Sequence, residues 1–70
     1  MSKEAYNRIK AVLAEKSVTN KELAEALGKG MNTVSRWCTN ENQPPIDTLY
    51  EIAEYLDVSV YELLVDNKKK

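Results

Sequence analysis

The sequence has few of the residues from which catalytic and metal sites are built. Its 70 residues include no histidine and a single cysteine, Cys38. One cysteine cannot form an internal disulfide, and without histidine it cannot complete a metal site. The sequence also lacks a glycine-rich phosphate loop and a nucleophile beside a plausible base. We therefore expect no cofactor, no metal and no enzymatic activity, and a reducing cytoplasm is the simplest location.

Glycine, proline and long apolar runs are also scarce. Only two glycines and two prolines occur, whereas 43% of the residues are apolar and 30% are charged. This balance is typical of a compact helical domain and not of a disordered chain. No apolar run approaches the roughly 18 residues that a membrane span needs, and the N-terminus lacks the apolar core of a signal peptide. We expect one small domain over residues 1–66, a disordered basic tail over 67–70, and no membrane association.

The net charge of −1 hides an uneven distribution. Residues 1–36 carry seven Lys or Arg against four Glu, whereas residues 37–67 carry seven acidic residues and no basic one. Such polarity fits a protein with one face turned toward phosphates and another kept away from them. It also fits a merely patchy surface. Lys3, Arg8 and Lys10 are interpreted as a solvated face in preference to direct phosphate contacts.

The stretch 19–37 predicts two short helices joined by a glycine turn. Thr19 is a good N-cap for the first helix, and Glu22 completes a capping box. Gly28 stands where a left-handed residue would end this helix. Its inward face, at helical spacing, consists of Leu23, Ala24 and Leu27.

The second helix of this stretch is expected to begin near Met31. Val34 and Trp37 face inward, whereas the polar residues Asn32, Ser35 and Arg36 point elsewhere. Two helices in this arrangement form a helix-turn-helix, whose second helix can enter the major groove of DNA. Trp37 is expected to join this helix to the core and not to stack on bases.

Three further helices complete the expected fold. The first runs over residues 3–16 with Ser2 as its cap, and its buried stripe is Ala5, Ile9, Val12 and Leu13. Pro44 and Pro45 interrupt the chain after a left-handed Asn40. The next helix covers residues 46–56, and a short last helix is capped by Ser59 with Glu62. The predicted fold class is therefore all-α, a compact five-helix bundle.

Five segments in order resemble the phage repressor and Cro type of helix-turn-helix domain, the XRE family. They are TNKELAEALG at 19–28, NTVSRW at 32–37, PxIDTL at 44–49, IAxxLxVS at 52–59 and ELL at 62–64. The resemblance covers about residues 9–64. It implies a lambda-repressor-like domain that binds double-stranded DNA, usually as a homodimer, and acts as a transcriptional repressor or regulator.

The resemblance also implies which residues read bases. Arg36 can form a fork onto guanine O6 and N7, and Asn32 can pair with adenine N6 and N7. Met31 offers an apolar contact to a thymine methyl group, and Thr33 a methyl or hydroxyl contact. The alternative is that all four are exposed helix residues without a role in recognition.

Two other groups of residues are assigned by the same resemblance. Phosphate contacts are expected from the start of the first motif helix, from the turn, and from the amides after the second helix; these residues are Asn20, Lys21, Lys29, Asn40, Asn42 and Gln43. The dimer interface is expected near the last helix, at Val58, Val60, Tyr61 and Leu64. In the alternative interpretation Leu63 and Leu64 belong only to the core. A second hypothesis is a protein-interaction module that keeps this fold but has lost DNA binding. No small-molecule site is evident.

The sequence departs from the family at positions that predict packing and specificity. Leu13 and Cys38 replace an Arg and a Glu that form a partly buried ion pair between helices in the family. Replacement of both by apolar groups is often neutral or stabilising, so Leu13 and Cys38 are expected to pack together, with Cys38 as a core thiol. Glu41 and its neighbours, Asn42 and Gln43, replace the Lys or Arg that approaches the minor groove. Gly30 replaces a Ser or Thr cap.

Overall fold

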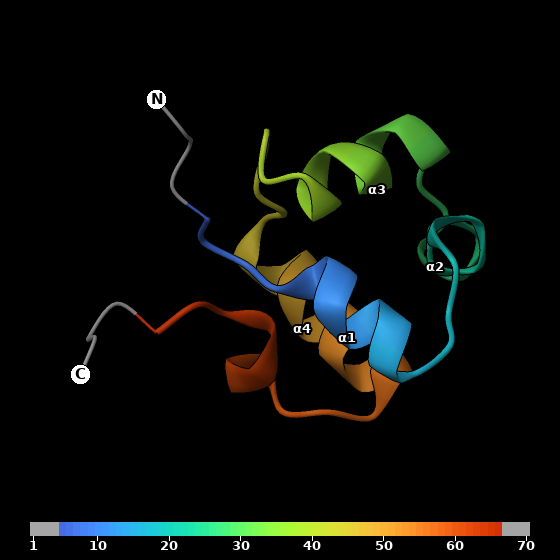
Figure 1. Cartoon of the computed structure of the whole chain (residues 1–70). Coiled ribbons are helices and arrows are strands. Elements are labelled where there is room, and N and C mark those ends of the chain that lie inside the picture. The colour runs from blue at the N-terminus through green and yellow to red at the C-terminus, as the bar shows by residue number, and fades with distance from the viewer. Residues whose placement is uncertain (1–4, 67–70) are drawn as a thin grey trace.

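The computed structural model describes residues 5–66 and contains four α-helices and one 3-10 turn (Figure 1). The helices are α1 (Ile9–Glu15), α2 (Asn20–Leu27), α3 (Met31–Cys38) and α4 (Ile46–Leu56), followed by the 3-10 turn η1 (Val60–Leu63). The predicted all-helical class is confirmed. The predicted count of five helices is not confirmed, because a single 3-10 turn forms in place of the last α-helix. The expected basic tail, residues 67–70, lies outside the described residues.

One apolar cluster holds the elements together. α2 packs on α3 and α4, whereas η1 packs on α1 and α4. In Figure 1, α2 therefore stands on the side of the molecule opposite η1. The residues that are most completely buried come from all five elements; they are Ile9, Val12, Leu23, Val34, Ile52 and Leu63.

Trp37 joins α3 to this core. Its side chain is only 4% exposed, in agreement with the prediction that it does not stack on bases. Leu13 of α1 and Cys38 of α3 are buried in the same cluster. This burial agrees with the expectation that Cys38 is a core thiol, and the direct contact between Leu13 and Cys38 stays a prediction.

The turn between α2 and α3 follows the sequence signals. The Thr19 hydroxyl accepts a hydrogen bond from the Glu22 amide, and the Glu22 carboxylate accepts one from the Thr19 amide, so the predicted capping box is present. Gly28 ends α2 in the left-handed conformation with φ of 69°. An L side chain there would cost roughly 1–2 kcal/mol because its Cβ crowds the following carbonyl oxygen. Gly30 precedes α3 and offers no side chain to cap it.

The first helix begins later than the expected residue 3. Asn7 ends the preceding extended segment, because its Oδ1 accepts from the Ile9 amide at 3.0 Å and its own amide donates to Asn40 Oδ1 at 3.0 Å. An Asn side chain that bonds the backbone two residues ahead competes with helix formation. Ala5, expected in the buried stripe, is exposed. The expected cap Ser2 and the expected first residue Lys3 lie outside the described part of the chain.

The extended segment before α1 pairs with the segment after η1. Asn7 and Leu64 form an isolated antiparallel bridge. On either side of it, the Arg8 amide donates to Leu63 O at 2.8 Å and the Val65 amide donates to Tyr6 O at 3.1 Å. The two ends of the domain are therefore joined by backbone hydrogen bonds.

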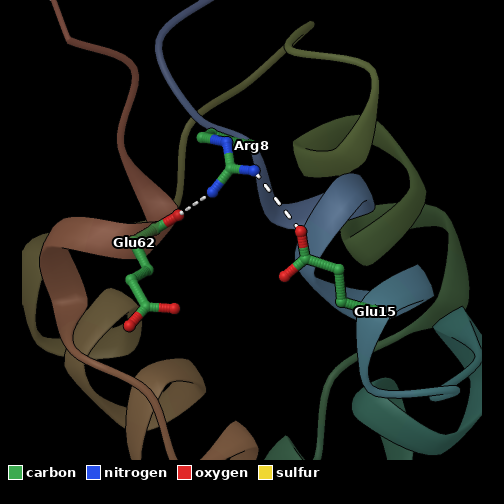
Figure 2. A network of polar contacts seen from close by, with 3 residues as sticks. All are labelled: Arg8, Glu15 and Glu62. Atoms are coloured by element: carbon green, nitrogen blue, oxygen red, sulfur yellow. Dashed lines mark hydrogen bonds and ion pairs between the residues drawn. The ribbon is translucent and has the colours of Figure 1, made fainter.

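Arg8 reinforces this junction (Figure 2). Its Nη1 donates to the Glu62 carbonyl oxygen at 2.8 Å, and its Nη2 lies 3.6 Å from Glu15 Oε2. Arg8 therefore links η1 to α1, whereas the sequence indicated a solvated side chain.

At the start of η1, the Ser59 hydroxyl caps the turn by accepting a hydrogen bond from the Tyr61 amide.

Candidate nucleic-acid interface

The outer face of α3 carries all four residues that were predicted to read bases. Met31, Asn32, Thr33 and Arg36 are exposed. The opposite face of the same helix is buried in the core. The structure therefore brings the four predicted residues together on one solvent-facing surface of an anchored helix.

The first turn of α3 has uncapped backbone amides. The Val34 amide donates to Gly30 O, but within residues 5–66 the amides of Met31, Asn32 and Thr33 have no hydrogen-bond acceptor. The first amides of a helix lack intrahelical partners, and Gly30 has no side-chain oxygen to replace them. These donors therefore remain available to an external acceptor beside the exposed side chains.

The start of α2 presents a second pair of donors. The capping box uses the Glu22 amide, whereas the amides of Asn20 and Lys21 have no acceptor in the described part of the chain. The Lys21 side chain and Lys29 in the turn are exposed and form no ion pair with a described residue. Free amides and ammonium groups are the donors that phosphate oxygens accept.

The side chain of Asn20 is oriented by Cys38. The thiol of Cys38 donates to Asn20 Oδ1 at a sulfur–oxygen distance of 3.5 Å, which leaves Asn20 Nδ2 free as a donor. Burial raises the pKa of the Cys38 thiol, and the positive charge of Lys10 offsets part of this effect. Cys38 is therefore a neutral thiol that positions Asn20. The sequence identified Cys38 as a core residue, but it contained no signal for this contact between residues 18 positions apart.

The loop after α3, whose backbone amides were expected to contact phosphate, is stabilised by the side chains of Asn40 and Gln43. Asn40 Oδ1 accepts from the amides of Tyr6 and Asn7 and from Gln43 Nε2, and Asn40 Nδ2 donates to Asn7 O. Gln43 Oε1 accepts from Asn7 Nδ2 at 2.7 Å. The Asn40 and Gln43 side chains therefore tie the loop to the N-terminal segment, whereas Asn42 is exposed and has no side-chain partner among residues 5–66.

Asn7 is the buried centre of this network and was not identified from the sequence. It is only 4% exposed, and its Nδ2 also donates to Trp37 O at 3.0 Å. A buried amide of this kind must be satisfied, because an unpaired polar group costs about 1–3 kcal/mol. The one available signal was the position of Asn7 two residues before the apolar Ile9. An Asn side chain commonly forms a turn by bonding to the backbone two residues ahead.

Arg36 has an acidic neighbour at the end of the same helix. Arg36 Nε lies 3.8 Å from Glu41 Oε1, and both side chains are more than half exposed. This distance corresponds to an ion pair and is too long for a hydrogen bond. The terminal nitrogen atoms of Arg36 form no bond to a described residue, so they remain available.

The residues expected at a dimer interface fall into two groups. Val58 and Val60 are half-buried against the core, whereas Tyr61 is 81% exposed and Leu64 39% exposed. Leu63 is fully buried, which resolves the question left open by the sequence: Leu63 belongs to the core and Leu64 to the surface. Val58, Val60 and Tyr61 also line a shallow hollow of about 480 Å³ together with Tyr50, Ala53, Glu54 and Ser59.

Residues 5–66 contain no group of three or more His, Cys, Asp or Glu residues that could hold a metal ion. Within that range, no helix has the length and apolar character required to cross a bilayer.

Two helices at a tight turn, with the second helix exposed along one face, define the class of helix-turn-helix proteins. A family model described as helix-turn-helix matches residues 9–63. The chain belongs to this family, which confirms the resemblance to the phage repressor and Cro type of domain. A comparison with curated proteins found no match.

A solved structure supports this assignment. The chain is similar to a candidate DNA-binding protein from Bacteroides fragilis, with 53% sequence identity and a TM-score of 0.85. The match covers 86% of this chain and 97% of that one. The likeness therefore extends over nearly the whole domain.

Proposed function

We propose that the protein is a sequence-specific DNA-binding regulator of transcription, acting as a repressor, that inserts α3 into the major groove. The observation that supports this most directly is the exposed face of α3, where Asn32 and Arg36 lie one helical turn apart. Their side chains can read adenine and guanine, respectively, while Met31 contacts a thymine methyl group and Thr33 adds a methyl or hydroxyl contact. The similarity to a candidate DNA-binding protein points to the same ligand.

The phosphate contacts are proposed on both sides of α3. Asn20 and Lys21 bind one phosphate through free amides and side-chain donors, and Lys29 adds a charge from the turn. On the other side, Asn42 contributes its free side chain, and the Gln43 amide has no acceptor within residues 5–66. Asn40 contributes indirectly, because its amide donates to Trp37 O and its side chain fixes the loop.

The protein is proposed to act as a homodimer. A single domain of this size makes few phosphate and base contacts, so useful affinity requires two half-sites about one helical turn apart. The exposed Tyr61 and Leu64, with Val58 and Val60 beneath them, supply the apolar surface for this contact.

The decisive experiment is selection of bound sequences from a random pool of duplex DNA. We expect a palindromic consensus, because each subunit of a twofold dimer reads the same half-site. Arg36→Ala should weaken binding to the consensus and relax specificity at one guanine, at a cost of about 1–3 kcal/mol.

Arg36→Lys is the matched control for charge. It keeps the positive charge but loses the planar fork, so it should lose discrimination while retaining the dependence of affinity on salt. Unchanged affinity and specificity in Arg36→Ala would contradict the proposed function.

A protein-interaction module is the second candidate. The exposed Glu51 and Glu54 of α4 form no ion pair with any described residue, and they line a shallow hollow with Ala26, Leu27 and Tyr55. An acidic surface of this kind suits a basic partner. Absence of binding to random duplex DNA at low salt, where phosphate attraction is strongest, would favour this function over DNA binding.

A further inference from the structure

The backbone at the end of α3 fixes Glu41 beside Arg36. Thr39 ends the helix, and Asn40 follows it in the left-handed conformation with φ of 64°. The Glu41 amide donates to Arg36 O at 2.9 Å, and the Asn40 amide donates to Trp37 O at 3.1 Å. These are the two hydrogen bonds of a Schellman motif.

The side chain of Asn40 further restrains this position. Its four hydrogen bonds to Tyr6, Asn7 and Gln43 hold the loop against the N-terminal segment. The Cα atom of Glu41 is therefore fixed relative to Arg36 by backbone hydrogen bonds and by the side chain of Asn40, which keeps the two charged groups within reach of each other.

Glu41 approaches the Nε edge of the guanidinium and not the pair of terminal nitrogen atoms. Glu41 Oε1 lies near Nε, on the side of the group. The two terminal nitrogen atoms point away from the side chain and form the fork that fits guanine O6 and N7. A carboxylate at Nε therefore restrains the rotation of the fork without occupying it.

The charge of Glu41 has a second effect. A carboxylate beside the recognition helix repels phosphate, and it competes with phosphate for the charge of Arg36. In a non-specific complex, where Arg36 finds no guanine, its alternative partner is the DNA backbone. Glu41 therefore weakens non-specific binding more than specific binding.

We infer that Glu41 is a specificity-determining residue, which orients Arg36 toward guanine and limits its contacts with phosphate. The inference rests on the proposed function. It goes beyond that function because it assigns the discrimination to a residue that does not itself contact a base.

The test compares affinity for the selected site with affinity for a random duplex of equal length. In Glu41→Gln, which has nearly the same shape, the affinity for random duplex should rise. The ratio of specific to non-specific affinity should fall about two- to fivefold, the size expected for one exposed ion pair. In the Arg36→Ala background the same substitution should leave the ratio unchanged, since the partner is absent.

Glu51→Gln is the control for net charge. Glu51 is exposed on α4 and forms no ion pair with a described residue. Its substitution should change specific and non-specific affinity in parallel and leave their ratio unaltered. Thermal melts of all variants check that the fold is retained.

The outcomes distinguish a failure of the inference about Glu41 from a failure of the proposed function. If Arg36→Ala loses specificity but Glu41→Gln keeps the wild-type ratio, the inference about Glu41 is wrong and the proposed function stands. The same conclusion follows if Glu41→Gln lowers the ratio equally without Arg36. A wild-type protein that selects no sequence would overturn both.

Discussion

At the scale of single residues, Cys38 and Asn7 show how buried polar atoms prepare an exposed surface. The Cys38 thiol donates to Asn20 at the start of α2, and the Asn7 amide group bonds to Gln43 in the loop after α3. Buried groups therefore position residues at both ends of the proposed DNA contact, Asn20 at one end and Gln43 at the other. A buried donor gives the side chain that accepts its hydrogen bond a preferred orientation.

Cys38 should react slowly with thiol reagents in the folded protein. The reactive species is the thiolate, and burial raises the pKa of this thiol above its usual value of 9.0. Labelling should accelerate in denaturant and at alkaline pH, where the thiolate forms. Rapid labelling of the native protein near neutral pH would contradict the assignment of Cys38 as a core thiol.

The raised pKa also has a consequence for stability. A neutral thiol favoured in the folded state stabilises the protein at pH values below the thiol pKa of the unfolded chain. This contribution is lost as the pH rises through the folded pKa. Chemical denaturation at a series of alkaline pH values should therefore show a smaller decline in Cys38→Ala than in the wild type.

Asn7→Ala should lower the free energy of unfolding by about 1–3 kcal/mol. The substitution removes the acceptor of the buried Ile9 amide, one of the two donors to the Trp37 carbonyl, and the Asn7 donor to Gln43 Oε1. Asn42→Ala is the matched control. Asn42 is an exposed Asn in the loop after α3, with no side-chain partner in residues 5–66, so its substitution should change stability by less than about 0.5 kcal/mol.

At the scale of elements, local chemistry accounts for α2, α3 and their turn. The capping box fixes the start of α2, and the left-handed Gly28 fixes its end. Amphipathic spacing then decides which face of α3 enters the core. These signals lie within a few residues of the structure they specify, which is why the predicted bounds agree with the observed ones.

The two glycines of the turn should respond differently to substitution. Gly28→Ala should destabilise the protein by roughly 1–2 kcal/mol, because φ is 69° there. Gly30→Ser should stabilise it by a few tenths of a kcal/mol, because Gly30 has an ordinary φ, open space around an added Cβ, and an uncapped helix after it. Denaturant midpoints measure both effects, and equal changes at the two positions would contradict this account.

At the scale of the whole molecule, the acidic residues of α4 and the basic residues of the helix-turn-helix lie on different elements. The acidic residues of α4 carry no described ion pair, whereas Lys21, Lys29 and Arg36 belong to the helix-turn-helix. This arrangement explains how a protein with a net charge of −1 can still attract DNA. Attraction depends on the local field at the binding face more than on the total charge.

Tyr61→Glu should weaken the proposed dimer and lower affinity for a two-half-site duplex. Tyr61 is the most exposed large apolar side chain among the described residues, and a carboxylate there would repel the same residue across a twofold axis. Sedimentation velocity gives the oligomeric state. Tyr55→Glu is the control for the added charge. Tyr55 is less exposed than Tyr61 and lines the separate hollow between α2 and α4. A wild-type protein that is monomeric both free and on DNA would contradict the dimer.

The errors of sequence interpretation share one cause. The predicted first helix extended to residue 3 because its apolar spacing continues to Ala5. The observed helix begins only at Ile9, because Asn7 is held in the preceding extended segment by Asn40, which lies 33 residues away. Arg8 was interpreted as solvated for the same reason, since its acceptor is the carbonyl of Glu62. The side-chain hydrogen bonds by which Asn40 and Gln43 hold the N-terminal segment were not predicted either, and the phosphate contacts of their backbone amides stay a prediction. No local pattern contains these partners.

The sequence by itself determined the all-helical class, the helix-turn-helix, the left-handed turns at Gly28 and Asn40, and the residues that α3 exposes. Caps, turn residues and helical periodicity act over one to four positions, so they can be interpreted from neighbours alone. Only the tertiary structure decided the start of α1, the short 3-10 form of the last turn, the network around Asn7, and the orientation of Asn20 and Arg36. These features depend on hydrogen bonds and contacts that exist only after distant segments have been brought together by burial of the common core.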